Sequence, residues 1–312
     1  MSPPPRGPAA PLRALAAAAF ALAALAAARP ASAYCFTYDC DPTSGRCPIN
    51  EDDGCPGGSV RLSWGARCVG FWLQRDGSRQ IGVDAFDPIA RAAFDAWTGA
   101  DCGGGRGPSI EVSLQGRVAC DKQEYNQDDG NANIIMFRDD VWPYTGADNT
   151  LALTTLTFNT DTGEVYDADM EINGTSRMRL TTSDTDVDKD LLSIVTHEAG
   201  HFLGIAHTQR ALHPDATMFA SYDAGTITLR DLAQDDRDAI CALYPAGASR
   251  GACDPTPRHG YASECGDGKS DDDGCRVAAP GRAPAPGPLP LVALAALAAL
   301  ARRRRAGRPA RP

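Results

Sequence analysis

Three of the five histidines in this 312-residue chain lie within eleven residues, in the stretch HEAGHFLGIAH at positions 197–207. On a helix, residues four apart lie one turn above each other, so His197 and His201 can present imidazole nitrogens to one ion. Gly204 tolerates positive φ, so it can end the helix and let His207 complete the set. Three protein ligands that leave one coordination position open are the arrangement of a catalytic zinc. The spacing therefore predicts one catalytic zinc ion.

A carboxylate stands beside the first of these histidines. Glu198 is turned by about 100° from His197 around the helix axis, where it can reach a zinc-bound water without being a ligand. The sequence predicts that Glu198 takes a proton from this water and later passes it to the leaving amine of a peptide. One alternative is a chance cluster of surface or core histidines. The other is a surface binding or adhesion module that has the fold of such an enzyme but no catalytic activity.

The segments around the motif predict an α+β fold with a mixed, twisted sheet, a zinc-binding active-site helix and a C-terminal helix. DKDLLSIVTHEAGHFLG has a broad apolar helical face with Asp188 or Asp190 as start signal and a glycine as stop. An earlier helix is expected from Asp87, as cap before Pro88, to Gly99, and a closing helix in LAQDDRDAICALYP. Strands are expected in SVRLSWGARCVGFWL, SIEVSLQG, NANIIMFRDD and, as a pair, NTLALTTLTFNTDTGEVYDADMEIN.

The histidine motif resembles that of the metzincin metallopeptidases, and in particular that of the matrixins. Met218, in ATMFASY, matches the methionine that these enzymes place in a tight turn beneath the metal. Tyr222 stands where matrixins have a tyrosine near the active site; other metzincins carry a metal-associated tyrosine two residues after the methionine, where Ala220 stands, so Tyr222 is not assigned as a ligand. The resemblance covers about residues 59–245. It implies a zincin-like fold and a zinc endopeptidase whose extended substrate lies antiparallel to an edge strand at about Leu151–Phe158.

Two features of vertebrate matrixins are not expected here. No histidine precedes His197, so we expect the second, structural zinc to be missing. Only about 25 residues of the exported chain precede the first expected strand, too few for the long propeptide whose cysteine blocks the zinc. One of four early cysteines could cap the metal instead, although their even count favours disulfides, so the mechanism of latency stays open. These cysteines are Cys35, Cys40, Cys47 and Cys55.

An acidic hairpin suggests a possible second metal. NTDTGEVYDADME places Asp161, Asp167, Asp169 and Glu171 around a turn at Gly163. Hard oxygen ligands of this kind suit calcium, which makes a calcium site a further hypothesis. The spacing is not that of an EF-hand loop, and a charged hairpin tip explains the same acids without a metal.

Both ends of the chain predict export. The first 33 residues contain no acid and combine arginines, an apolar run and Ala31-Ser32-Ala33, the pattern of a signal peptide cleaved before Tyr34. Its apolar run is shorter than the roughly 20 residues of a membrane span. At the other end, Gly274-Cys275, an apolar run at 289–301 and four arginines resemble the MYXO-CTERM type of sorting tail. That resemblance implies display on the cell surface or outer membrane of a bacterium; a simple tail anchor or a disordered end is the alternative.

The cysteines and the charge agree with an extracellular protein. Apart from Cys275, ten cysteines remain, so five disulfides are possible, although the pairing cannot be read from the sequence. Without both ends, the chain keeps 19 basic residues against 40 acidic ones, a balance that repels nucleic acid and attracts cations. We expect a monomer that binds peptides. The expected organisation is a signal peptide (1–33), a Cys-rich segment (34–58), a catalytic domain (59–247), a Cys- and Asp-rich linker (248–275) and the sorting tail (276–312).

Overall fold

The computed structural model describes residues 34–40, 48–49, 54–208, 214–249, 251–266 and 275–278. The expected signal peptide lies outside these residues, and so does the expected sorting tail beyond Ala278. Within the part that is described, no helix combines the length and the apolar character needed to cross a bilayer.

The centre of the fold is a mixed sheet of seven strands in the order β11-β6-β7-β5-β3-β4, with β2 beside β7. Strands β2, β3, β4, β5 and β7 pair in parallel, whereas β6 is antiparallel to β7 and to β11. The mixed helix and strand fold expected from the sequence is therefore confirmed. The strands are β2 (Ser63–Trp64), β3 (Cys68–Gln74), β4 (Glu111–Val118), β5 (Ile134–Arg138), β6 (Ala152–Phe158), β7 (Glu164–Asn173) and β11 (Cys275–Ala278).

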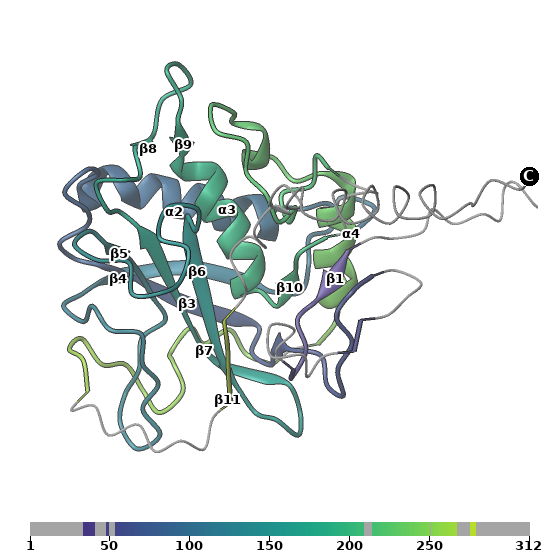
Figure 1. Cartoon of the computed structure of the whole chain (residues 1–312). Helices are drawn as coiled ribbons and strands as arrows, with labels where there is room; N and C mark the ends of the chain where they lie inside the picture. The colour runs from purple at the N-terminus through teal and green to yellow at the C-terminus, as the bar shows by residue number, and fades with distance from the viewer. Residues whose placement is uncertain are drawn as a thin grey trace, which may run out of the picture.

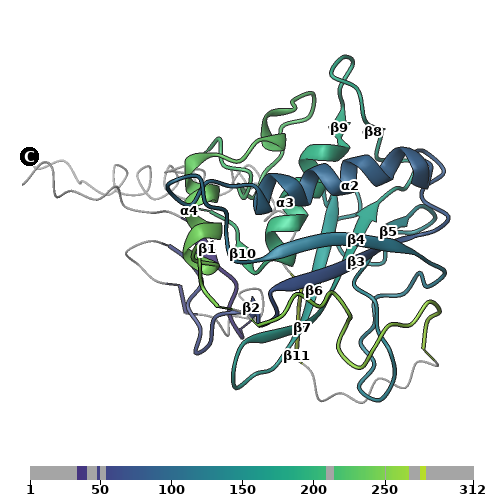
Figure 2. The same cartoon turned by 180° about the vertical axis from the view of Figure 1, so that it is seen from behind.

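Two helices cover one face of this sheet, as both views of the cartoon show (Figures 1 and 2). They are α2 (Val83–Thr98) and α3 (Leu191–Phe202), and α4 (Gln234–Leu243) follows at the end of the domain. Aromatic rings join the layers: the ring centre of Phe94 on α2 lies 4.5 Å from that of Phe71 on β3 and 5.0 Å from that of Phe202 on α3. The core that these rings form holds α3 firmly over the sheet.

The expected start of α2 was wrong. The helix begins at Val83, after Gly82 as N-cap, and Pro88 lies inside it. Because Pro88 stands in the second turn, it leaves the carbonyl of Asp84 without the amide that would otherwise bond to it. The carboxylate of Asp87 accepts a hydrogen bond from Arg91 Nε at 2.7 Å instead of capping the helix.

Short strands that the sequence did not predict brace the ends of α3. Strand β1 (Cys35–Phe36) pairs antiparallel with β10 (Ile205–Ala206), directly after α3. Strand β8 (Leu180–Thr181) pairs in parallel with β9 (Lys189–Asp190), directly before it. The Cys-rich segment before residue 59 is thus attached to the turn that follows α3.

The expected disulfide framework is confirmed in part. Cys35 and Cys55 form a disulfide with each other, and Cys40 is also disulfide-bonded, so none of these three offers a thiol for capping a metal. Cys47 lies outside the described residues. Two of the bonds, together with a ring stack of Tyr261 on Trp72, hold residues 251–266 of the expected linker against the domain. The disulfides found among the described residues are Cys35–Cys55, Cys68–Cys253, Cys102–Cys241 and Cys120–Cys265.

The strand expected to be a free substrate edge is partly covered. Strand β6 follows the expected range closely, but β11 pairs with it from Thr155 to Phe158. An unpaired edge presents a row of backbone donors and acceptors that any extended segment can satisfy. The sequence could not show that the chain itself supplies such a segment.

Candidate active site

The three motif histidines converge on one point. His207 Nε2 lies 3.1 Å from His197 Nε2 and 3.1 Å from His201 Nε2. Two nitrogens that bind a tetrahedral zinc at about 2.0–2.1 Å lie roughly 3.3 Å apart, close to the observed spacing. The three ring nitrogens therefore fit a single zinc ion.

Hydrogen bonds at the far side of two rings orient them. His197 Nδ1 lies 2.7 Å from the carbonyl oxygen of Thr217, and His201 Nδ1 lies 2.8 Å from that of Ile205. A carbonyl only accepts, so each Nδ1 carries the proton and each Nε2 presents a lone pair to the centre.

The same rings are kept neutral by their surroundings. Burial lowers the pKa of His197, and it lowers that of His201 well below its ordinary value, with further lowering by the neighbouring rings. Burial and the proximity of His197 lower the pKa of His207 to about 3. Neutral imidazole is the form that binds metal, so the site needs no deprotonation of these residues at neutral pH.

Local sequence signals set the bounds of α3. The Asp190 carboxylate accepts a hydrogen bond from Ser193 N at 2.8 Å and caps the helix start. Gly204 follows the last turn with φ of 93°. A Cβ at this position would lie 2.6 Å from the carbonyl oxygen of Leu62, so glycine is needed for both conformation and space. The turn leads into β10 and brings His207 back to the other histidines.

Glu198 faces the same region from a buried position. Its side chain is 6% exposed, and its Oε2 accepts a hydrogen bond from Thr154 Oγ1 at 2.7 Å. Burial raises the pKa of Glu198 to about 7, and the Thr154 hydroxyl opposes that rise. Sequence reasoning missed Thr154; the signal was three threonines inside the strand LALTTLTF, whose other residues are apolar.

Met218 lies in a turn directly beneath α3. A Cβ added to Gly200 on the helix would meet the Met218 sulfur, which shows how closely the two pack. The backbone amides of Thr217 and Met218 donate to the Asp236 carboxylate at 2.7 and 3.0 Å. Asp236, in the first turn of α4, therefore holds the turn in place, although burial raises the pKa of its carboxyl. The sequence indicated Met218 but not the role of Asp236.

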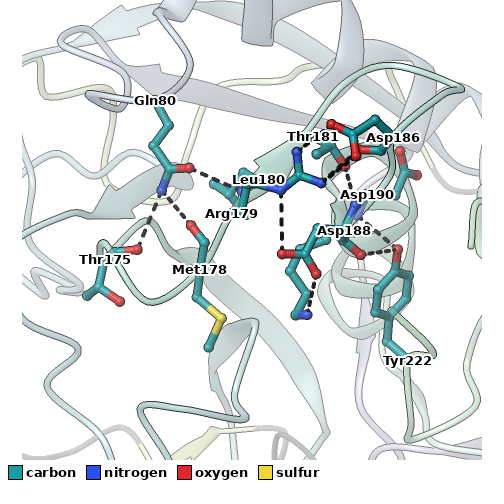
Figure 3. Close-up of polar contacts among 11 residues, drawn as sticks. Gln80, Thr175, Met178, Arg179, Leu180, Thr181, Asp186, Asp188, Asp190 and Tyr222 are labelled. Atoms are coloured by element: carbon teal, nitrogen blue, oxygen red, sulfur yellow. Dashed lines mark hydrogen bonds and ion pairs between the residues drawn. The ribbon is translucent and has the colours of Figure 1, made fainter. Parts of the chain in front are cut away.

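The Tyr222 hydroxyl contacts the start of α3. It accepts a hydrogen bond from Asp190 N at 2.9 Å (Figure 3). It also donates to the Thr226 carbonyl oxygen at 2.6 Å. The Asp188 carbonyl oxygen is 3.2 Å away. Through these contacts the Tyr222 oxygen closes the loop after the Met218 turn and fixes it to α3.

The loop before α3 is held by further polar contacts (Figure 3). Gln80 Nε2 donates to the Met178 carbonyl oxygen at 2.7 Å, and Gln80 Oε1 accepts from Leu180 N at 3.1 Å. Arg179 pairs with Asp186 at 3.0 Å. The segment that contacts Tyr222 is therefore tied to the loop that precedes α2.

A cavity of about 430 Å³ lies beside the histidines. The start of β6 forms one wall, and the loop after Met218 forms the other. In the second wall, Tyr222, Asp223, Ala224 and Leu229 line the cavity. Apolar lining comes from Ile194, Phe219 and Leu229, and polar lining from Lys189 and Asp223.

The four acids proposed for calcium do not form one cluster. Asp161 is exposed in the β6–β7 turn, whereas the other three lie buried along β7. The Asp169 carboxylate accepts from Glu124 N and Ile134 N, and Glu171 is paired with Arg138. Among the described residues, the side chains grouped like metal ligands are the three histidines and two disulfides, each with a glutamate. Calcium gains no support from the positions of Asp161, Asp167, Asp169 and Glu171.

Comparison with known proteins agrees with the motif. No curated protein matches the chain. The family model for matrixin matches residues 115–245, a range that begins in β4, ends just after α4 and contains the three histidines. Strand β3 and helix α2, which the sequence resemblance included, precede the match. Residues 115–245 are thus identified as a matrixin-like segment, which supports a zinc-dependent metallopeptidase.

Proposed function

We propose that the protein is an exported zinc endopeptidase that hydrolyses peptide bonds with one metal-activated water. The observation that carries the proposal is the convergence of three neutral imidazoles beside a buried carboxylate. His197, His201 and His207 would hold the zinc through Nε2. The bound ion supplies the positive charge that polarises the scissile carbonyl and lowers the pKa of the attacking water.

Glu198 moves the proton. Its carboxylate accepts the proton of the water that attacks the peptide carbonyl, and later delivers it to the nitrogen of the leaving amine. A pKa near neutrality suits a group that must first accept and then donate a proton, and burial raises the Glu198 pKa to about 7 before any metal binds. The Thr154 hydroxyl holds one oxygen of this carboxylate in place.

The substrate would be an extended peptide lying antiparallel to β6. Such a strand gains main-chain hydrogen bonds along its length, and one side chain enters a pocket. The cavity lies beside Leu151 and Ala152 at the start of β6, where a residue after the cleaved bond would stand. Its lining by Ile194, Phe219 and Leu229 favours an apolar side chain.

The proposed place of action is outside the cell. The disulfides are of the kind that persist in oxidising compartments, and they agree with the predicted signal peptide. We propose that the mature chain works as a monomer, displayed on the surface or outer membrane of a bacterium through its C-terminal tail.

The test is zinc content together with cleavage of an unbiased peptide library by the exported chain. Wild type is compared with Glu198→Ala and with Glu198→Gln, which keeps the size of the side chain. We expect one zinc in all three and chelator-sensitive cleavage in the wild type alone. Retained cleavage by Glu198→Gln would refute the role of Glu198, and zinc without cleavage in any protein would favour a binding module.

A further inference from the structure

Strand β11 occupies part of the edge along which the proposed substrate would bind. It pairs antiparallel with β6, with Cys275 opposite Phe158 and Ala278 opposite Thr155. Figure 1 shows β11 beside β6, at the outer edge of the sheet. The pairing is the same type of strand addition that peptide-binding proteins use for their ligands.

The direction of β11 is that of a substrate. Its residue numbers rise from Phe158 toward Thr155, so the strand runs toward Thr154, whose hydroxyl bonds to Glu198. A peptide antiparallel to β6 runs the same way, and its cleaved bond must lie near Glu198. The residues before that bond would therefore lie along Thr155–Phe158, where β11 is.

The other half of the proposed substrate site is not covered by β11. The cavity is lined by residues up to Ala152 on β6, whereas β11 ends its pairing at Thr155. Strand β11 therefore occupies only the part of the β6 edge that would bind the N-terminal half of a peptide.

We infer that β11 is an intramolecular competitor that holds the N-terminal half of the peptide-binding edge of β6. This inference rests on the proposed function, because it assigns a regulatory role to the same site. The tether raises the local concentration of β11 far above that of a free peptide, so even a four-residue pairing can compete. Removal of the chain from Cys275 onward would open the edge.

A pair of prolines in the full exported chain tests this. Amides along a strand point alternately to its two sides, so one of two consecutive amides faces β6. Arg276→Pro/Val277→Pro removes both amides, whereas the control Arg276→Lys/Val277→Ile keeps them. Hydrogen exchange is measured over residues 152–158, and KM and kcat are measured for a library peptide. Zinc content and circular dichroism confirm that both variants keep the domain intact.

We expect faster exchange of the β6 amides and a lower KM in the proline variant alone, with kcat unchanged. If β11 fills the edge in about nine molecules of ten, it raises the apparent KM about tenfold, and its release lowers KM by the same factor. Unchanged exchange would show that β11 does not pair with β6, and faster exchange with an unchanged KM would show that it does not obstruct substrate. Either result overturns the inference.

A binding measurement separates this inference from the proposed catalysis. In a Glu198→Ala background, the probe is a fluorescein-labelled peptide with the sequence of residues 271–280, in which serine replaces Cys275. Tighter binding to the proline variant than to the control supports competition even if no protein cleaves the library. Equal binding to both contradicts it, whatever the cleavage assay shows.

Discussion

The hydrogen bond from Thr154 to Glu198 offers a direct test of how the proposed base is positioned. Thr154 is fully buried, and its hydroxyl is 2.7 Å from Glu198 Oε2. Thr154→Val exchanges the hydroxyl for a methyl group of similar size and leaves the carboxylate without this donor. A hydrogen bond to a charged group contributes about 1.5–3 kcal/mol, which corresponds to a loss of roughly 10- to 150-fold in kcat/KM if it is fully used in the reaction.

The pH profile gives the second signature of this change. The hydroxyl opposes the rise in the Glu198 pKa, so its removal raises that pKa further. The acid limb of the kcat/KM profile should therefore move to higher pH in Thr154→Val. Thr154→Ser keeps a donor at the same position and should stay close to wild type in both rate and profile.

The assay is peptide cleavage between pH 5 and pH 9, with zinc content measured on each protein. Equal zinc content in all three proteins shows that the metal site is intact. If Thr154→Val then keeps kcat/KM within about twofold of wild type and the same acid limb, the hydrogen bond does not position Glu198 and the reasoning fails.

Three further predictions concern the packing, the charge and the pocket of the site. Gly200→Ala should lower the melting temperature, because its new Cβ would lie 2.7 Å from Trp97 Cζ2. Such overpacking costs about 1–3 kcal/mol, whereas the gain in helix propensity is about 1 kcal/mol. A higher melting temperature would contradict this. In zinc-free protein, the folded state holds the Glu198 proton more tightly than the unfolded state, since its pKa is about 7 against an ordinary 4.5. The stabilisation from this proton is complete below pH 4.5 and lost as pH rises through 7, so wild type should lose about 3 kcal/mol relative to Glu198→Gln across that window in urea denaturation; a constant difference would refute it. Tyr222→Phe removes the contacts to Asp190 and the loop, so KM should rise severalfold with zinc content unchanged; loss of zinc would show that Tyr222 serves the metal instead.

The sequence by itself determined the parts of the site that depend on local geometry. His197, Glu198 and His201 share one side of α3 because helix periodicity alone sets their directions. Asp190 starts that helix and Gly204 ends it through contacts within a few residues. The four strands between residues 111 and 173 were likewise visible as alternating or branched apolar runs. The expected start of α2 was wrong because Pro88 was taken as a residue of the first turn, whereas it stands in the second turn of a helix that begins at Val83.

Only the tertiary structure decided which distant residues serve the site. Thr154 meets Glu198 across 44 positions, Asp236 holds the amide of Met218 across 18, and Cys68 pairs with Cys253 across 185. The position of β11 on β6 is a contact of the same long-range kind. Backbone edges and hydrogen-bonding side chains accept many partners of equal chemistry, so local sequence cannot select among them. The selection is made when the layers pack and bring one particular partner within bonding distance.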